Sequence, residues 1–136
     1  FLALAGLHLY WGLGGFWPGR DADSLRLLVV GTPAGPMYGL AACAAVAAAF
    51  TGAAAVIGAG HMGIASGGLR SMIVCGYIVL IAVFGLRGLA PYVTSIFDYA
   101  RGSSFFELNR TYFSPLCLAI AAALTADFYA ALIRVR

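Results

Sequence analysis

The chain has 136 residues, of which 62% are hydrophobic and only 10% are charged. A soluble domain of this size would carry roughly a quarter charged residues, so the composition excludes an ordinary soluble globular domain. The net charge of +3 comes from arginines that stand singly along the chain, which argues against nucleic acid as a partner, because phosphate binding needs clustered basic side chains.

Apolar runs of membrane-spanning length fill most of the chain. A helix needs about 20 apolar residues to cross a hydrocarbon core roughly 30 Å thick. We expect spans over residues 1–17, 36–60, 71–90 and 115–135, approximately. The sequence therefore predicts an all-α integral membrane four-helix bundle, with residues 1–136 forming a single transmembrane domain.

The first apolar run ends in aromatic residues and glycines. Trp11, Trp17 and Pro18 are typical of a helix end at the membrane interface, where tryptophan is enriched. A secretory signal peptide is disfavoured because no small-residue cleavage site follows the run. The chain begins at Phe1, inside the run, so we expect the first helix to lack an N-terminal turn.

The second span is rich in small residues and follows a cluster of helix breakers. Pro36 suits the first helical turn, where a missing N–H costs nothing. Ala44, Ala48 and Gly52 repeat at four-residue spacing, the pattern that lets membrane helices approach closely. We expect this span in the middle of the bundle, touching more than one neighbour. The same pattern fits contact with a partner subunit equally well.

The loop before the last span has internal order. Apolar residues recur at helical spacing over residues 92–101, which predicts an amphipathic interfacial helix in the headgroup plane. Ser104 and Glu107 have the spacing of a capping box, which would start a second short helix. Ser114 and Pro115 then fit the N-cap and first turn of the last span.

Aromatic side chains concentrate on one side of the predicted bundle. An ordinary membrane protein has an aromatic belt at each interface, so a one-sided concentration predicts a cap of loop residues over the bundle mouth, with a pocket beneath it. The alternative is that these rings only anchor loops among the headgroups. The residues concerned are Trp11, Phe16, Trp17, Tyr38, Tyr92, Phe105, Phe106, Tyr112 and Phe113.

His8 is the first candidate for a functional role. It lies nine residues before Trp17, hence on the order of 13 Å from that interface if the helix is continuous. An ionisable group at such depth is a functional hypothesis, for example an axial ligand to haem or to a pigment magnesium, or a hydrogen-bond donor to a quinone. The alternative is a neutral imidazole bonded to a carbonyl. His61 falls at the opposite edge and cannot complete a bis-histidine site.

Arg87 is the second candidate, near the end of the third span. Either it snorkels to water, or it binds an anionic headgroup or a carboxylate such as Asp98 or Glu107. Polar and aromatic residues of the long loop share its side of the membrane, which predicts one ligand site there. The candidate site residues are His8, Trp11, Arg87, Asn109 and Tyr112.

Asp127 lies inside the last span, about 12 Å from the terminal side at the helical rise. Tyr77 on the third span lies at a comparable depth and is a candidate hydrogen-bond partner, and Arg134 is two turns away on the same face. A proton relay would need a chain of such groups across the membrane, and none is visible. We therefore expect a locally paired carboxylate.

Other chemistry is disfavoured. Cys43, Cys75 and Cys117 lie in different spans without a Cys-x-x-Cys pair, which argues for small packing residues rather than thiol redox chemistry. The sequence has no metal motif, no phosphate-binding glycine loop and no nucleophile near a base. We expect no catalytic and no metal-binding residues.

The motifs at residues 8–19 (HLYWGLGGFWPG), 83–88 (VFGLRG), 106–109 (FELN) and 112–117 (YFSPLC) resemble bacterial four-helix membrane proteins known only as a domain of unknown function. The resemblance spans nearly the whole chain. It implies the same four-span fold and nothing biochemical. Pro91 departs from the pattern, which has a more flexible, glycine-like position there.

These features leave three functional hypotheses. The first is a non-catalytic accessory subunit that packs against other membrane protein subunits and lipids through small-residue helix faces and its aromatic cap. The second is a module that contacts a pigment, haem, quinone or lipid through the candidate site residues. The third is a lipid-modifying enzyme, for which the sequence names no nucleophile.

The expected location is a bacterial inner membrane with both termini in the cytoplasm. Four spans place the termini and the second loop on one side. Arg70, Arg134 and Arg136 lie on that side without acidic neighbours, and cytoplasmic loops carry an excess of arginine and lysine. The other side carries Arg20, Arg26, Arg101 and Arg110, with Arg87 at the edge, so the orientation rests on the short, acid-free segments of the terminal side and not on the arginine count.

Overall fold

The computed structural model describes residues 1–32, 35, 38–62 and 67–134, with side chains up to residue 131. The described chain is helical and contains no strand. In chain order its helices are α1 (Leu2–Gly12), α2 (Ala22–Val29), α3 (Leu40–His61), α4 (Gly68–Val93), a 3-10 turn (Asp98–Ala100), α5 (Ser104–Leu108), a π-helical turn (Asn109–Phe113) and α6 (Ser114–Arg134).

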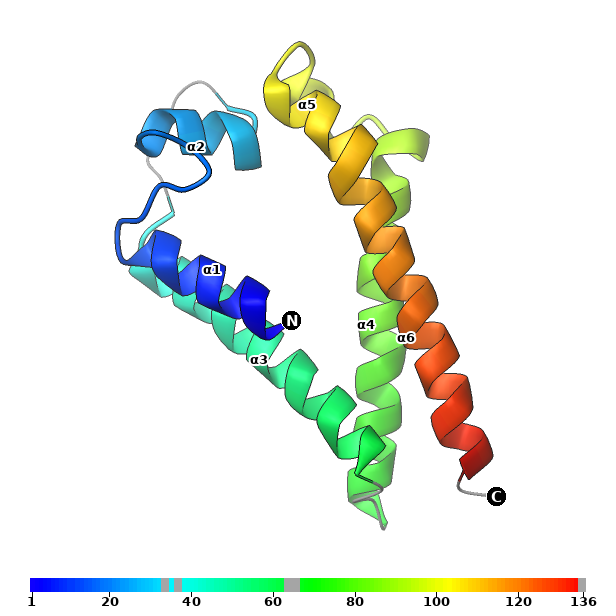
Figure 1. Ribbon diagram of the computed structural model, residues 1–136. Coiled ribbons are helices and arrows are strands. Elements are labelled where there is room, and N and C mark those ends of the chain that lie inside the picture. The colour runs from blue at the N-terminus through cyan, green and yellow to red at the C-terminus, as the bar shows by residue number, and fades with distance from the viewer. Residues whose placement is uncertain (33–34, 36–37, 63–66, 135–136) are drawn as a thin grey trace.

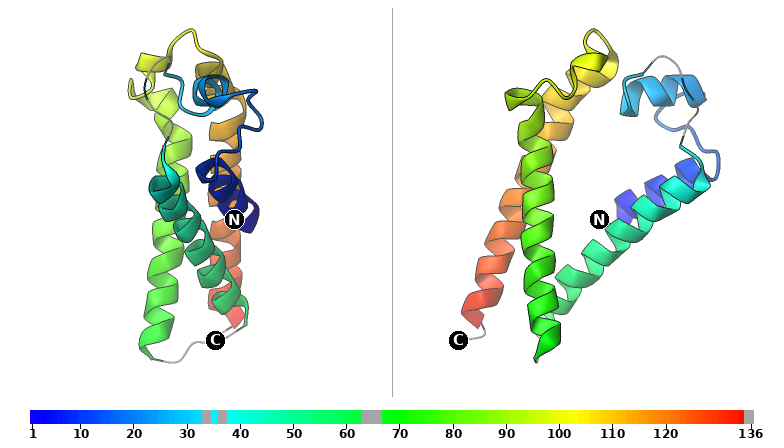
Figure 2. Two further views of the ribbon diagram at one scale, coloured as in Figure 1. Left: turned by 90° about the vertical axis from the view of Figure 1, so that its left-hand side faces the viewer. Right: turned by 180° about the vertical axis from the view of Figure 1, so that it is seen from behind.

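The helices form two antiparallel pairs that diverge from a common end. Helix α1 packs along α3, and α4 packs along α6. The two pairs meet where the end of α3 approaches α4 and open towards α2 and α5, as the two further views agree (Figures 1 and 2). Ile73, Tyr77 and Leu124 form the buried core at this junction. Helix α3 contacts both α1 and α4, which confirms the prediction that it touches more than one neighbour.

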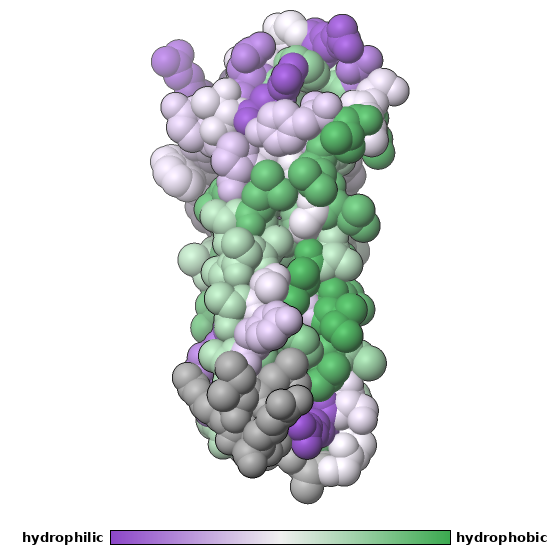
Figure 3. Space-filling view, turned by 90° about the vertical axis from the view of Figure 1, so that its right-hand side faces the viewer, coloured by the Kyte–Doolittle hydropathy of each residue, from purple (hydrophilic) through white to green (hydrophobic). Residues whose placement is uncertain are grey.

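The protein is a membrane protein. Three stretches of the described chain are long and apolar enough to cross a membrane, namely α3, α4 and the continuous helical stretch Ser104–Ala131. On the face shown in Figure 3, apolar side chains cover most of the middle, and strongly hydrophilic side chains gather towards the two ends. Helix α1 has 11 residues, so it is shorter than the about 20 that a span requires.

The first helix ends earlier than predicted. It stops at Gly12, and residues 13–17 fold back over its last turn. Gly14 has a φ of +94°, and the N–H of Gly15 donates to the carbonyl of Tyr10. A Cβ on Gly15 would lie 2.2 Å from the Tyr10 ring, so only glycine permits this close return. The prediction of a helix over residues 1–17 was therefore wrong at its C-terminal end.

The amphipathic helix lies in the first loop, not the third. Asp21 caps α2 by accepting from the N–H of Ser24, and Leu25 within the helix is fully buried. The helix predicted over residues 92–101 does not form. Helix α4 continues through Pro91 and ends at Val93. Thr94 is its C-cap, and both the N–H and the hydroxyl of Thr94 donate to the carbonyl of Ala90.

The last span begins earlier than predicted. Ser103, not Ser104, caps α5 by accepting from the N–H of Phe106. A π-helical turn then joins α5 directly to α6, so Ser114 and Pro115 lie inside a continuous helix and do not start one. Pro115 has no N–H to give the preceding turn, and a wide π turn accommodates that loss.

Helix α3 begins at Leu40 with Gly39 as its N-cap. The predicted start at Pro36 was too early, and Pro36 itself lies outside the described residues. Of the predicted small-residue stripe, Ala44 is half-buried, whereas Ala48 and Gly52 are exposed. The helix uses other residues internally: Cys43, Ala47 and Ala53 are the buried ones.

Candidate functional site

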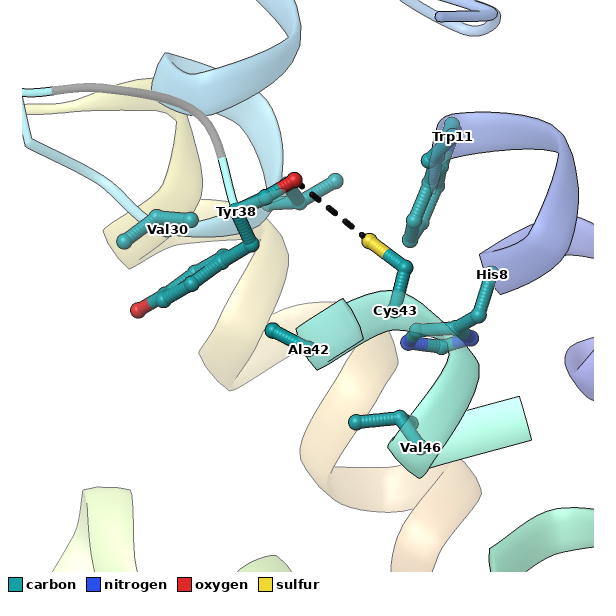
Figure 4. Close-up of a pocket in the computed structure, with 8 residues that line it drawn as sticks. His8, Trp11, Val30, Tyr38, Ala42, Cys43 and Val46 are labelled. Carbon is teal, nitrogen blue, oxygen red and sulfur yellow. Dashed lines mark hydrogen bonds between the residues drawn. The ribbon is translucent and has the colours of Figure 1, made fainter. Parts of the chain in front are cut away.

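A cavity of about 300 Å³ lies between α1, the end of α2 and the start of α3 (Figure 4). Its wall is almost entirely apolar, and His8 contributes an ionisable group to it. Ligand pockets of small molecules typically have this size and character. The lining residues are His8, Trp11, Val29, Val30, Tyr38, Ala42, Cys43 and Val46.

The His8 ring is held in one orientation. Its Nδ1 lies 2.8 Å from the carbonyl oxygen of Leu4. A carbonyl only accepts, so Nδ1 carries the proton and donates it, which leaves the lone pair on Nε2. Trp11 packs edge-on at 5.0 Å between ring centroids, and Phe50 lies at 5.4 Å. Within the described chain Nε2 has no hydrogen-bond partner, so it is available to a ligand.

The depth predicted for His8 was too large. That prediction assumed a continuous helix from His8 to Trp17, whereas α1 ends at Gly12. At the helical rise His8 lies about 6 Å from the end of its helix. The indole N–H of Trp11 donates to the carbonyl of Trp17 at 2.7 Å, which ties the returning chain to the helix end beside the cavity.

Arg87 and Asn109 form a second site. Arg87 Nη2 donates to the Asn109 side-chain oxygen at 2.7 Å, and the guanidinium lies 4.8 Å from the centre of the Phe97 ring. The carboxylate partners considered for Arg87 are not used. Asp98 instead pairs with Arg101 at 2.9 Å, and Glu107 is exposed.

The five predicted site residues therefore do not form one site. His8 and Trp11 line the cavity together. Arg87 and Asn109 contact each other, and neither lines that cavity. Tyr112 is 64% exposed and takes part in neither group. The sequence could not predict this separation, because it depends on the divergence of the pairs α1–α3 and α4–α6, which only the three-dimensional structure shows.

Rings from the third loop pack together over the end of α4. Phe97 contacts Tyr99 and Phe105, and Phe105 contacts Phe113, at centroid distances of 5.9 to 6.5 Å. The Tyr99 hydroxyl donates to the carbonyl of Val30 at 2.9 Å, which joins this cluster to the first loop. Phe105 and Phe113 were predicted members of an aromatic cap. Phe97 and Tyr99 were missed because they were assigned to the amphipathic helix.

Asp127 sits in a polar group at the other end of the molecule. The Tyr77 hydroxyl donates to Asp127 Oδ2 at 2.5 Å, which confirms the predicted pairing. His61 Nε2 lies 3.2 Å from Asp127 Oδ1, a contact that sequence reasoning missed. The side chain of Arg134 lies outside the described residues. The carboxylate is thus locally paired by groups from two other helices.

The cysteines are free thiols. Cys43 is buried in the cavity wall, and its thiol lies 3.6 Å from the carbonyl oxygen of Tyr38 (Figure 4). In the part of the chain that the structure describes, no three histidine, cysteine, aspartate or glutamate side chains are grouped to hold a metal ion.

Comparison with known proteins identifies a family whose function is unknown. No curated protein and no solved structure matches the chain. A family model described as "Protein of unknown function (DUF3995)" matches residues 1–124. The match covers all of the helical elements described above except the last part of α6. The chain therefore belongs to the family of unknown function DUF3995.

Proposed function

We propose that this protein is a non-catalytic accessory subunit of a larger membrane protein complex. The observation that carries the proposal is a seam of small residues along α3 that no other part of the described chain covers. It consists of Ala41, Ala45, Ala48, Gly52 and Ala55, all of them exposed.

The spacing of this seam is that of a helix-packing surface. Its members alternate at four and three residues, which keeps them on one face over the length of the helix. A Cβ built on Gly52 meets no atom within 4 Å. Contact with lipid tails does not require small side chains, whereas a second helix can bring its backbone close to this face because the side chains are small. The seam is thus suited to a helix from another subunit.

The test is purification of the full chain in a mild detergent, with leucine placed on the seam. The wild type should migrate as a larger assembly, and Ala48→Leu should release the chain from it, because the added side chain separates the helix backbones. Ala82→Leu, at an exposed position of α4, is the matched control and should leave the assembly intact. A wild-type chain that is a stable monomer would contradict the proposal.

A second candidate function rests on the His8 cavity. The unprotonated Nε2 of His8 can accept a hydrogen bond or coordinate a metal. The favoured ligands are therefore a quinol or another ring compound with an O–H or N–H donor, or the metal of a haem or pigment. A quinone carbonyl or a lipid ester only accepts and matches Nε2 less well in this tautomer.

Absorbance and mass spectrometry of a native-detergent preparation test this second candidate. A bound ring compound should be retained by the wild type and lost from His8→Gln. His61→Gln, which changes the same side chain outside the cavity, should retain it. Equal ligand content in both variants would place the compound elsewhere.

We also propose that α1 lies in the membrane as part of a fourth span, and that the membrane is a bacterial inner membrane with the C-terminal end of α6 in the cytoplasm. The support is the apolar sequence of α1, its packing along α3 and the arginine distribution. A periplasm-dependent reporter enzyme fused after residue 136 should be inactive, whereas activity would reverse the orientation.

A further inference from the structure

Three buried polar side-chain atoms of the described chain have no hydrogen-bond partner, and they belong to residues that contact one another in series. They are Arg87 Nη1, Asn109 Nδ2 and the hydroxyl oxygen of Ser114. Asn109 and Ser114 are both completely buried. Buried polar groups in proteins are almost always hydrogen-bonded, so a cluster of exceptions needs a cause.

Two hydrogen bonds connect the three residues through Asn109. Arg87 is bonded to the Asn109 side chain, as described above. Asn109 opens the π-helical turn, and the N–H of Ser114 donates to the Asn109 carbonyl, so the two residues lie one wide turn apart on the same helix. Such π turns occur frequently at functional sites.

Among the described residues, no carboxylate forms an ion pair or hydrogen bond with Arg87, Asn109 or Ser114. Asp98 is paired with Arg101, and Asp127 with Tyr77 and His61. Arg87 donates to the neutral Asn109 amide, lies over the face of the Phe97 ring and interacts electrostatically with the Cys117 thiol. The unmatched groups are a cation, an amide N–H and a hydroxyl, all of which can donate. Their complement is an oxygen that carries negative charge.

We propose that Arg87, Asn109 and Ser114 form a binding site for an oxyanion, that is, a phosphate or carboxylate oxygen from a lipid headgroup or from a small soluble anion. Arg87 is half-buried, so part of its side chain reaches the surface, while its unpartnered Nη1 lies beneath that surface. It stands six residues before the end of α4, about 9 Å along the helix, a depth from which a guanidinium meets headgroups. The site shares no residue with the His8 cavity and goes beyond the accessory role proposed above.

Asn109→Asp is the decisive variant. It keeps the shape of the side chain but gives Arg87 an internal carboxylate and removes the Nδ2 donor. An anion should then be repelled while the helix packing is retained. Arg87→Gln removes the cation. Arg101→Gln is the matched control, because it removes an arginine from the same loop region that is already paired with Asp98.

The measurement is thermal unfolding of the full-length chain in a neutral detergent, with dioleoylphosphatidylglycerol, dioleoylphosphatidylcholine, sodium phosphate or sodium acetate added. The wild type and Arg101→Gln should be stabilised by at least one anionic probe, and the apparent affinity should fall at least tenfold in Asn109→Asp. Stabilisation by phosphatidylglycerol alone identifies a lipid headgroup as the source, and stabilisation by phosphate or acetate identifies a soluble anion.

Two results would overturn the site. One is the absence of any shift from every anionic probe in the wild type. The other is an unchanged affinity in Asn109→Asp. If Arg87→Gln does not fold, the Asn109→Asp result alone decides, because that variant retains the arginine and supplies its partner.

Discussion

Tyr77 of α4 and Asp127 of α6 are joined by a hydrogen bond of 2.5 Å, although they are 50 residues apart in the chain. Tyr77 is almost completely buried, and Gly60 of α3 lies against its ring, since a Cβ there would come within 3.1 Å of it. With His61 also on Asp127, this pair is the polar contact at which three helices meet.

Removal of the Tyr77 hydroxyl should destabilise the fold. In Tyr77→Phe the ring still fills the core, but Asp127 loses a donor inside the membrane protein. Hydrogen bonds between membrane helices contribute about 1 kcal/mol, so the free energy of unfolding should fall by about that amount in a detergent titration. Tyr129→Phe, an exposed tyrosine on the same helix as Asp127, should have no effect.

Gly88 should not tolerate even a methyl group. A Cβ there would lie 2.7 Å from Leu118 Cγ and 3.1 Å from the Leu118 nitrogen, so α4 and α6 would have to separate. Overpacking of this kind costs about 1–3 kcal/mol. In the same titration Gly88→Ala should lower the free energy of unfolding by that amount.

Gly85 is the matched control for Gly88. It lies one turn earlier on α4, and a Cβ there meets no atom within 4 Å. Gly85→Ala should leave the free energy of unfolding unchanged or raise it by up to about 1 kcal/mol through helix propensity. Equal effects of the two substitutions would contradict the close packing of α4 on α6.

Gly31 should be required for docking of the first loop on α5. Its φ is +84°, and a Cβ would lie 2.6 Å from Phe105 Cδ1 and 2.8 Å from Ala100 Cβ. Gly14 has a similar φ of +94° with no atom nearby, so it isolates the backbone effect. Gly14→Ala should cost about 1–2 kcal/mol.

Gly31→Ala should cost a further 1–3 kcal/mol or so and should also speed hydrogen exchange of the amides in α2. If exchange in α2 is the same in Gly31→Ala and Gly14→Ala, the contact with Phe105 does not hold the loop.

The stability of α2 should depend on pH through its N-cap. The Ser24 N–H donates to Asp21 Oδ1 at 2.8 Å, and this bond holds the pKa of Asp21 below its ordinary value. A carboxyl whose pKa is lower in the folded chain stabilises it above the unfolded pKa, about 3.9. That stabilisation is lost as the pH falls through the folded pKa.

Hydrogen exchange in α2, measured from neutral pH down to about pH 3, should therefore show protection that fades at the acidic end. Asp21→Asn still caps the helix but does not titrate, so this part of the pH dependence should disappear. Persistence of the same pH dependence in Asp21→Asn would assign it to another group.

The long apolar helices were predictable because each depends on its own composition. Residues 71–90 lie within α4, and most of residues 36–60 lie within α3. The Tyr77 and Asp127 pairing was also predictable, since two polar groups at equal depth in a membrane have few other partners. The wrong predictions lie at helix ends, where more than one residue can cap a helix or appear to stop it. Ser103 and Ser104 both fit an N-cap. Pro91 and Pro115 were interpreted as helix boundaries, although α4 continues through Pro91 and the helical stretch Ser104–Ala131 continues through Pro115.

The sequence by itself determined that this is a membrane protein and which long helices can cross the membrane, because the hydropathy of a segment depends only on the residues within it. Only the tertiary structure decided that α1 and α3 diverge from α4 and α6, that His8 and Arg87 lie in separate groups of residues, and that Arg87 Nη1 and Asn109 Nδ2 have no acceptor among the described residues. The physical reason is that these outcomes depend on close contacts, such as Gly88 on Leu118 and Gly31 on Phe105, which join residues far apart in the chain.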